Sequence, residues 1–366
     1  MKTTNKHIFV ISDLEMGKKD QMDDFCDDDA LVKFLKFIGA FTVSKPVTLV
    51  LNGDIFDFLK MDHRGKYSRY ITEEISLWKL EQILQAHASV FEAMRDFVNH
   101  PMVKIIFVIG NHDADLVWPA LQKKLRLVLN QNERVEFTFH FDEETLHIEH
   151  GNLVDPFFAF DWRKPIIRYR GEAILNLPIG SQIVSQHLVP VKKKFHREER
   201  LYPRSAAFSH SPEFEQEIKN LLYHQSWRVF LIEPLLHLGD PTYRIPYISI
   251  LKFVFRHGIS FICDEAFLDL KKLIKAHSFA KFFVLSHTHA IKTFHFRKRR
   301  ILITDTWRNE YNLLTKRKKE HTYAEISIKN GQIESMELKV FSAEKERGHK
   351  KIQQDPVTYS TAKLGV

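Results

Sequence analysis

Three short apolar runs rich in β-branched residues lie in the first third of the chain, and each ends abruptly in a polar turn that contains Asp or Gly. They cover residues 7–11, 47–51 and 104–109. Between them, apolar residues recur at helical spacing over about 30–40 and over a long segment at about 72–98. Strands that alternate with helices predict crossover connections and a largely parallel sheet, which binds ligands at the carboxyl ends of its strands.

The pattern changes in the middle of the chain. Two further strands are predicted between about 135 and 150. Residues 156–280 are then rich in Phe, Pro and basic side chains, with helical stretches near 212–222, 245–257 and 264–277. Strand-like patterns return afterwards, at 282–285, 292–296, 301–306, 322–328 and 333–341. The dipeptide Asn330-Gly331 between the last two strands predicts a tight hairpin.

These patterns predict a core made of residues 1–155 and 281–341, interrupted by a helical insert at 156–280. One interpretation gives the insert a packing role only, such as a dimer contact. The other makes it a cap over the active site, which we favour because both ends of the insert adjoin polar motifs. The aperiodic tail, 342–366, is expected to be flexible.

Composition narrows the class of protein. Hydrophobic residues make up 44% of the chain and charged residues 27%, which excludes a disordered protein. The net charge of +8 favours anionic partners, although the basic runs at 192–200, 297–300 and 316–319 are each expected to be solvated faces. Two cysteines, Cys26 and Cys263, fit free thiols in a reducing cytoplasm. Because no apolar run approaches the roughly 18 residues of a membrane span, we expect a soluble protein, at most peripheral to the inner face of a membrane.

Polar clusters stand at the ends of the predicted strands. There are five of them, in the order Asp13-Leu14-Glu15, Gly53-Asp54-Ile55-Phe56-Asp57, Gly110-Asn111-His112-Asp113, His150-Gly151-Asn152 and His287-Thr288-His289. Each alone is a weak signal. Together they bring carboxylates, a carboxamide and imidazoles to one edge of a sheet, a donor set that suits Mn, Fe or Zn. A bridging carboxylate holds two such ions about 3.5–4 Å apart in hydrolytic sites.

In this order the clusters resemble the signature of the calcineurin-like metallophosphoesterases: Asp-x-His, Gly-Asp-x-x-Asp, Gly-Asn-His-Asp/Glu, a lone His, and Gly-His-x-His. The resemblance covers the core segments. It implies an α/β fold, a four-layer α/β/β/α sandwich, here with a large helical insertion. It also implies a metal-dependent hydrolase of phosphoester or pyrophosphate bonds with two divalent cations, in which a metal-bridging hydroxide attacks phosphorus in line.

The same resemblance assigns roles to individual residues. Asp54 is expected to bridge both cations. The other ligands divide between the two positions, with Asp13, Glu15 and His289 at the first and Asn111, His150 and His287 at the second. His112 is expected to contact the phosphate and assist the leaving group, while Asp57 orients or charges its imidazole.

The chain departs from the family pattern at two positions. Glu15 stands where the family has His, so that position gains a negative charge and a harder oxygen donor, which favours Mn or Mg over softer metals. Manganese is therefore the favoured metal, with Mg, Fe and Zn as alternatives. In the other interpretation, Glu15 turns away and the first cation is weakly held. Ser286 replaces the Gly before His-x-His, a change that we expect to be tolerated.

The insert and the second cluster resemble those of the bacterial UDP-2,3-diacylglucosamine diphosphatases. This implies a nucleotide–lipid diphosphate substrate and peripheral contact with membrane lipid. In that case apolar side chains would bind acyl chains, and Arg163, Arg168 and Arg170 would bind phosphates. The chain departs from that branch at His112 and Asn152.

Two other functions remain open. A nuclease or another phosphodiesterase of the superfamily would use the same metals, but nucleic acid is not favoured because no regular basic–aromatic interleaving is present. A metal-binding protein without catalysis would follow if Glu15 had disabled the first cation position.

Other polar residues are interpreted without a catalytic role. His147 is interpreted as an ordinary strand residue, and the acidic run 23–29 as negative charge at the N-terminus of the helix that follows. Trp307 and Arg308 are weak candidates for substrate contact.

Overall fold

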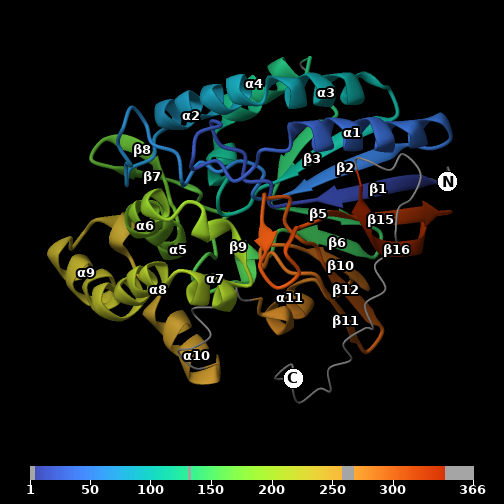
Figure 1. The fold of residues 1–366 in the computed structure, drawn as a ribbon. Coiled ribbons are helices and arrows are strands. Elements are labelled where there is room, and N and C mark those ends of the chain that lie inside the picture. Colours follow the sequence, from blue (N-terminus) through green and yellow to red (C-terminus); the bar gives the residue numbers. More distant parts are fainter. Residues whose placement is uncertain (1–4, 131–132, 258–267, 343–366) are drawn as a thin grey trace.

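Two mixed β-sheets stacked face to face form the centre of the molecule (Figure 1). The computed structural model describes residues 5–130, 133–257 and 268–342, with the backbone alone at 253, 254, 256 and 257. The first sheet has the order β16-β15-β1-β2-β3-β4. Its strands are β1 Lys6–Ile11, β2 Val47–Asn52, β3 Val103–Val108, β4 Val135–Thr138, β15 His321–Lys329 and β16 Gln332–Phe341. Strands β1 to β4 are parallel, as predicted, and β15 and β16 join antiparallel.

The second sheet has the order β11-β12-β10-β6-β5. Its strands are β5 His140–Glu143, β6 Leu146–Glu149, β10 Phe282–Leu285, β11 Lys292–Phe296 and β12 Arg299–Ile303. Strand β10 runs parallel to both β12 and β6, so the carboxyl ends of these three strands lie at the same edge of the sheet. The prediction of two strands between 135 and 150 was wrong, because two sharp turns divide the segment into three strands and move β5 and β6 to the second sheet.

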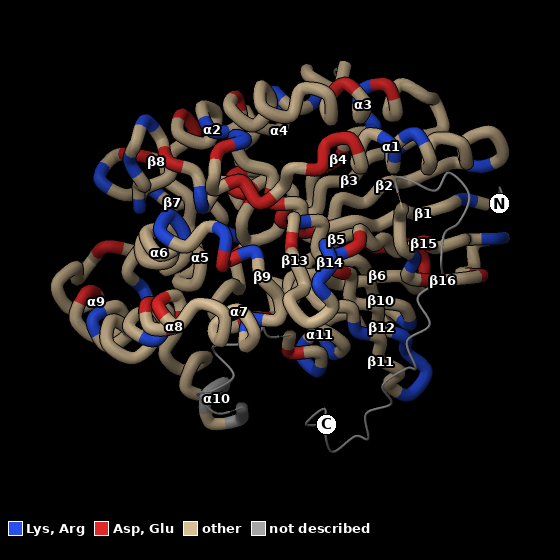
Figure 2. The backbone as a smooth tube through the Cα atoms, in the orientation of Figure 1, with Lys and Arg blue, Asp and Glu red and all other residues tan. Residues whose placement is uncertain are grey.

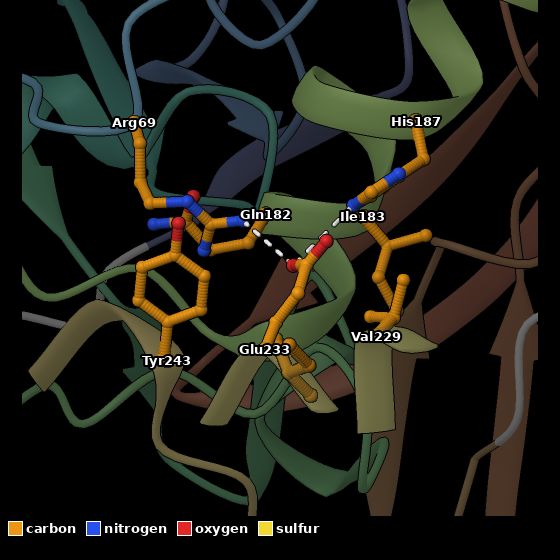
Figure 3. Close-up of a pocket in the computed structure, with 8 residues that line it drawn as sticks. Arg69, Gln182, Ile183, His187, Val229, Glu233 and Tyr243 are labelled. Atoms are coloured by element: carbon orange, nitrogen blue, oxygen red, sulfur yellow. Dashed lines mark ion pairs between the residues drawn. The ribbon is translucent and has the colours of Figure 1, made fainter. Parts of the chain in front are cut away.

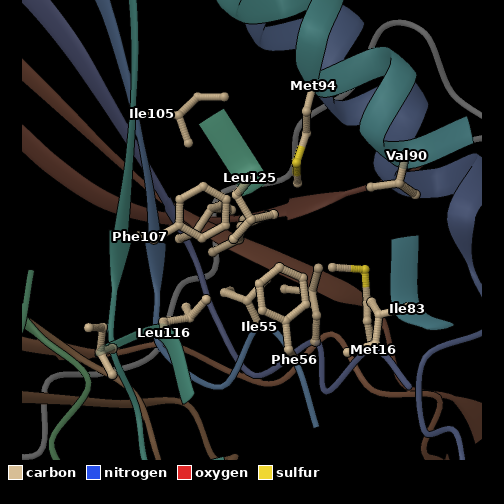
Figure 4. Packing of buried hydrophobic residues seen from close by; sticks show 14 of the residues in the cluster. Met16, Ile55, Phe56, Ile83, Val90, Met94, Ile105, Phe107, Leu116 and Leu125 are labelled. Atoms are coloured by element: carbon tan, nitrogen blue, oxygen red, sulfur yellow. The ribbon is translucent and has the colours of Figure 1, made fainter. Parts of the chain in front are cut away.

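Helices cover the outer faces of both sheets. The helices α1 Asp28–Gly39, α2 Glu73–Ala86, α3 Ala88–Asn99 and α4 Pro119–Val128 lie on the first sheet (Figure 1). Their apolar faces meet the sheet in the largest core cluster, where Phe56 and Phe107 stack (Figure 4). A second cluster, including Val10 and Ile148, fills the space between the sheets. A third packs helix α11, Leu270–Ala276, on the second sheet. The predicted four-layer α/β/β/α sandwich is therefore confirmed.

The prediction of one long helix near 72–98 was wrong. The chain leaves the helical conformation at His87, with φ −110° and ψ 35°, and α3 starts immediately afterwards. The imidazole of His87 is fully buried between two carboxylates, 2.7 Å from Asp28 and 3.1 Å from Asp23. Apolar periodicity continues across this break, which is why the pattern does not show it. The hairpin at Asn330-Gly331 is confirmed, since both residues have the positive φ of a tight turn.

The segment between β6 and β10 carries short helices and a hairpin. They are β7 Ile166–Tyr169, β8 Glu172–Leu175, α5 Ile179–Ile183, α6 Val189–Lys194, β9 Leu201–Tyr202, α7 Arg204–His210, α8 Pro212–Lys219, α9 Glu233–Leu236 and α10 Tyr247–His257. Wider helical turns at Val184–Leu188, Asn220–Gln225 and Arg228–Ile232 join several of them. The division into core and insert stays a prediction. Cys263, part of the predicted helix at 264–277 and nearly all of the predicted tail lie outside the described residues.

Polar contacts tie this segment to the sheets. Strand β9 pairs with β13 (Tyr311–Asn312), which also pairs with β14 (Arg317–Lys318). The loop before α2 contributes Tyr70, whose hydroxyl donates to Asp240 at 2.6 Å. A pocket beside this loop is lined by Glu233, Arg69 and His187, and the Glu233 carboxylate lies 3.7 Å from the Arg69 guanidinium and 4.0 Å from His187 Nε2 (Figure 3). Within the described residues, no helix is long and apolar enough to cross a membrane.

Candidate metal centre

All five polar clusters lie at the carboxyl ends of strands, namely β1, β2, β3, β6 and β10. Backbone bonds join the clusters directly. The N–H groups of Asp13 and Glu15 donate to the carbonyls of Gly53 and Asp54, at 3.1 and 2.9 Å. The N–H of Ser286 donates to the carbonyl of His150 at 2.9 Å, which links the two clusters of the second sheet. The Asn52 side chain links the strand ends of the two sheets, since its Nδ2 donates to the Glu149 carbonyl at 3.0 Å.

Several of the candidate ligands have a left-handed backbone. The φ angles are 52° at Asp13, 53° at Glu15, 52° at Asp54, 72° at His287 and 50° at His289. Residues other than Gly adopt this region at a cost, and such positions concentrate at functional sites. The sharp turn that each angle produces directs the side chain away from its strand.

The second cation position is built around Asp54, His150 and His287. One ligand atom from each lies within 4.8 Å of the others, and all three residues are buried. The Nδ1–H of His150 donates to the carbonyl of Asn52 at 3.0 Å, so Nε2 keeps its lone pair for a cation. That Nε2 atom lies 3.0 Å from Oδ2 of Asp54. His287 is oriented in turn by Asp155, which accepts from its Nε2 at 3.2 Å.

Asn111 supplies the remaining donor predicted for this position. Its side chain is buried, and its Oδ1 atom has no hydrogen-bond partner within the described part of the chain. The next residue, His112, donates its backbone N–H to Oδ1 of Asp54 at 2.7 Å, which places Asn111 beside the Asp54 carboxylate. A buried carboxamide oxygen without a partner is unfavourable unless something else binds it.

Two glycines leave room for these ligands. A Cβ atom on Gly110 would come within 2.2 Å of the Asp54 carboxylate, and one on Gly53 within 2.5 Å of the His150 ring. Both contacts are far shorter than any tolerated packing distance. The glycines of the second and third clusters are therefore required by the close approach of the ligands.

Charge in this position is arranged for a cation. Burial alone would lower the pKa of His150, but the Asp54 carboxylate outweighs burial and raises that pKa to about 9. Burial opposes ionisation of Asp54 too, yet His150 and His112 hold its pKa well below the usual range. In the absence of metal, a proton on His150 thus supplies the positive charge that the site needs. Together with the unpartnered Asn111 oxygen, this shows that the donors fit a divalent cation.

The first cation position contains Asp13, Glu15 and His289. The Nε2 atom of His289 lies 3.3 Å from Asp13 and 3.5 Å from Glu15. Neither oxygen of Asp13 has a hydrogen-bond partner among residues that the structure describes. Glu15 does not turn toward solvent, since its side chain is only 1% exposed. These three side chains do face one another.

Protein cations also reach this position. The Lys60 ammonium forms a short ion pair with Glu15 and lies 3.0 Å from Asp57 and 2.9 Å from Asp24. The Arg308 guanidinium lies 3.4 Å from Glu15 and 3.3 Å from Asp24. Both cations are buried, and although burial opposes ionisation of Glu15, they hold its pKa well below the usual range. The first position thus fits a metal less well than the second, because fixed charges already neutralise Glu15.

Lys60 and Arg308 belong to a larger buried network that the sequence did not reveal. Asp24 also pairs closely with Lys192, and Lys192 lies 3.2 Å from Glu199. Figure 2 shows the acidic and basic positions crowded in the loops between helices α2 and α4 and strands β13 and β14. The solvated face predicted for the basic run 192–200 was wrong at Lys192, which is 1% exposed. The available signal was Lys60 itself, a charged residue within the apolar run Phe58-Leu59-Lys60-Met61.

His112 and Asp57 form a hydrogen-bonded pair at the edge of the site. The Nδ1–H of His112 donates to Oδ1 of Asp57 at 2.9 Å. Burial lowers the pKa of His112, but the carboxylates of Glu15, Asp54 and Asp57 outweigh it, so the net pKa is raised. Ser286, the second departure from the family pattern, is accommodated because its hydroxyl lies 2.9 Å from the Asn52 carbonyl.

The structure does not bring the predicted substrate arginines to this centre. Arg163, Arg168 and Arg170 are exposed on and beside the β7–β8 hairpin. Arg163 stacks on Trp162 and Arg170 on Tyr169, with centroid distances of 5.2 and 5.1 Å. No contact described for them reaches a candidate metal ligand. Trp307, in contrast, is fully buried and packs on His321, so it serves the core.

The family model described as calcineurin-like phosphoesterase matches residues 6–263, more than half of the chain. The match ends before His287 and His289, so these two positions rest on the geometry above. Members of this family use divalent metals. A search of curated proteins found no match.

The solved structures that match this chain include the following three. A dimetal phosphatase from Danio rerio is 11% identical, with 94% of this chain and 98% of that chain covered and a TM-score of 0.38. A predicted phosphoesterase from Streptococcus pneumoniae is 8% identical, with 96% and 99% covered and a TM-score of 0.32. Vacuolar Protein Sorting 29 from Cryptosporidium parvum is 11% identical, with 96% and 100% covered and a TM-score of 0.33. These low values carry no functional weight.

Proposed function

Since the chain belongs to the calcineurin-like phosphoesterase family, we propose that it is a metal-dependent hydrolase of phosphoester or pyrophosphate bonds. The observation that carries the proposal is the convergence of Asp54, His150 and His287 at one strand edge, with their ligand atoms within 4.8 Å. Asn111 completes this set with an unpartnered buried oxygen. A bound divalent cation would polarise a phosphoryl oxygen and activate water for attack on phosphorus.

The residues of the chain supply the proton transfer. Asp57 fixes the Nδ1–H of His112, so the other ring nitrogen is the atom that carries the proton to the leaving oxygen. Burial lowers the pKa of His112, but the neighbouring carboxylates of Glu15, Asp54 and Asp57 outweigh burial and raise it, which favours the protonated ring. Asp54 anchors the arrangement because its Oδ1 accepts from the His112 backbone.

The first cation position is proposed to work differently from the predicted two-metal scheme. The buried side chains of Lys60 and Arg308 neutralise the Glu15 carboxylate, so this carboxylate does not need a metal ion to balance its charge. We infer that the second position holds the tightly bound cation, and that a cation at Asp13 and His289 is bound weakly. Manganese remains the favoured metal, because carboxylate and carboxamide oxygens contribute to the donor set.

For the substrate, we propose a lipid-linked diphosphate of the UDP-diacylglucosamine kind. The support is a set of exposed apolar side chains on the segment between β6 and β10, at Trp227, Leu231, Leu235, Leu236, Leu238, Ile248, Leu251 and Phe255. Exposed apolar patches of this kind mark contacts with lipid or protein. Lipid contact at the inner face of a membrane is part of this proposal.

The test is a turnover screen of the purified chain with Mn, Mg, Zn and Fe. The substrates are nucleotide–lipid diphosphates, small chromogenic phosphodiesters, monoesters and DNA. Mn-dependent cleavage of the lipid diphosphate is the expected result, and preferred cleavage of DNA would favour the nuclease alternative. Metal binding without turnover of any ester would instead indicate lost catalysis.

The arginines of the insert provide a separate test of the substrate. Replacing Arg163, Arg168 and Arg170 by Ala should weaken turnover of the large lipid substrate and spare a small chromogenic diester. Remote contacts add binding energy only when the substrate is long enough to make them. Equal losses on both substrates would show that these arginines have a structural role.

A further inference from the structure

A second cluster of metal-ligand side chains lies on the outer face of the second sheet, beneath α11. Along β6, Leu146 and Ile148 pack between the sheets, so His147 and Glu149 point outward. Their outward neighbours are apolar, including Phe283 and Leu273. His147 is 0% and Glu149 2% exposed. Buried polar side chains in an apolar layer are unfavourable unless they bind something.

The side chains of this cluster converge at ligand spacing. His147 Nε2 lies 3.0 Å from Glu149 Oε2, and His277 Nε2 lies 3.8 Å from the same oxygen. The rings of His147 and His277 stack with centroids 3.6 Å apart, so a shared ion requires the partly exposed His277 ring to turn its Nε2 atom toward the ion. Asp142 accepts from Nδ1 of His147 at 2.6 Å, across the β5–β6 pair. One ligand atom each from Asp142, His147 and His277 lies within 4.8 Å of the others.

We propose that His147, Glu149 and His277 bind a divalent transition-metal ion and that Asp142 orients His147. Zinc ligands about 2.0–2.2 Å from a tetrahedral centre lie about 3.3–3.5 Å apart, and the measured distances of 3.0 and 3.8 Å bracket that value. A carboxylate on the other nitrogen of a metal-binding His is the usual supporting arrangement. Two imidazoles and one carboxylate suit Zn²⁺.

An unpartnered atom points to the same conclusion. The Oε1 atom of Glu149 is buried and has no hydrogen-bond partner within the described ranges. The other oxygen approaches His147 at 3.0 Å, the same separation as between Asp54 and His150 in the active site. A metal bound by both oxygens of Glu149 and by the two imidazoles would have four donor atoms and would also satisfy the free oxygen.

The site would fasten two distant parts of the chain. His147 and Glu149 lie on β6, whereas His277 follows α11 and precedes β10. Strand β10 leads into His287 and His289, so a bound ion would hold the connection that positions these ligands. The proposal does not depend on the proposed hydrolase activity.

Zinc content per chain tests the proposal. The full-length protein and its variants are loaded with Zn²⁺, desalted and analysed for metal. We expect His277→Gln and His147→Gln to hold one zinc fewer than the native chain. Asp142→Asn should keep the site but weaken its zinc affinity by about 10–100-fold. His140→Gln is the matched control, because His140 lies at the rim, 3.4 Å from Asp142, and is not a proposed ligand.

A second measurement covers the case in which a variant fails to fold. His147 is fully buried, so the His147→Gln variant is the one more at risk of misfolding. If it does not fold, the zinc content of His277→Gln decides the question, because the His277 side chain is 20% exposed in the native chain. Zinc should also raise the Tm of the native chain and of His140→Gln more than that of His277→Gln. Equal zinc content and equal Tm shifts in these three proteins would overturn the proposal.

Discussion

The two candidate cation positions, which the family pattern expects to share Asp54, differ in what neutralises their carboxylates. At the second position, Asp54 faces two imidazoles and a carboxamide oxygen, and the positive charge comes from a proton on His150 or from a metal. At the first, Glu15 meets the buried cations of Lys60 and Arg308. The donor types are similar at both positions, so ligand chemistry alone does not distinguish the two positions. They differ in whether buried protein cations already neutralise the carboxylates.

The comparison teaches that a buried carboxylate is a strong metal ligand only when no protein cation competes for it. Removing a charged group from water costs several kcal/mol, and that cost has to be offset by some partner. Lys60 and Arg308 provide the offset at Glu15 permanently. A metal at that position would have to coordinate a carboxylate that is already paired.

The largest expected effect is at Asp54, the ligand that we propose for the second position. Asp54→Asn keeps an oxygen that can accept from the His112 backbone but removes the negative charge. We expect turnover to fall by at least about 10³-fold, since metal charge stabilisation is worth several kcal/mol. Steady-state kinetics measure the loss, and metal analysis should show that the second position is empty. Near-native turnover would contradict the assignment of Asp54.

The next effect concerns stability at the first position. Lys60→Met removes one buried cation, so the carboxylates of Glu15, Asp24 and Asp57 each lose an ion-pair partner. Breaking a buried pair on one side costs about 3–5 kcal/mol of unfolding free energy. Denaturant unfolding measures this loss. Adding Glu15→Gln should restore part of it, because the double variant also removes one of the unpaired charges.

Comparable stability of the native and Lys60→Met proteins would show that Lys60 is not needed to neutralise Glu15. Lys104→Met is a matched control. The Lys104 side chain is 37% exposed and paired with Glu136 on the sheet surface, so its removal should change stability by less than about 1 kcal/mol.

The third effect tests the proton donor. His112→Gln keeps a side chain that can hydrogen bond to Asp57 but cannot deliver a proton. We expect kcat to fall by about 10²-fold, the lower end for general acid–base catalysis, while metal content stays unchanged. Asp57→Asn should cost less, because it only loosens the orientation of the ring. The expected loss is smaller on substrates with good leaving groups, and a constant loss across leaving groups would argue for a binding role instead.

The sequence predicted the fold and the gathering of ligands because both depend on local order. Each cluster directly follows a strand, and parallel strands bring their carboxyl ends to one edge. The competing cations were not predictable in this way. Arg308 lies 293 residues from Glu15 along the chain and reaches it through the turn after β12. Likewise, His147 was interpreted as an ordinary strand residue because nothing in the strand pattern shows that His277 packs on it.

The smallest expected effect is the most direct test of the comparison. Glu15→His restores the imidazole of the family pattern and frees Lys60 from one partner. We expect Mn²⁺ to bind at the first position more tightly in this variant, so that metal content at the same low free Mn²⁺ concentration rises from about one toward two per chain. Glu15→Gln serves as the control, since it also removes the charge but offers no imidazole, and its content should stay near one. Measuring both in a His277→Gln background removes any contribution from the outer cluster. Two tightly bound Mn²⁺ ions in the chain that retains Glu15 would show that Lys60 and Arg308 do not compete with metal, and the two positions would then be equivalent.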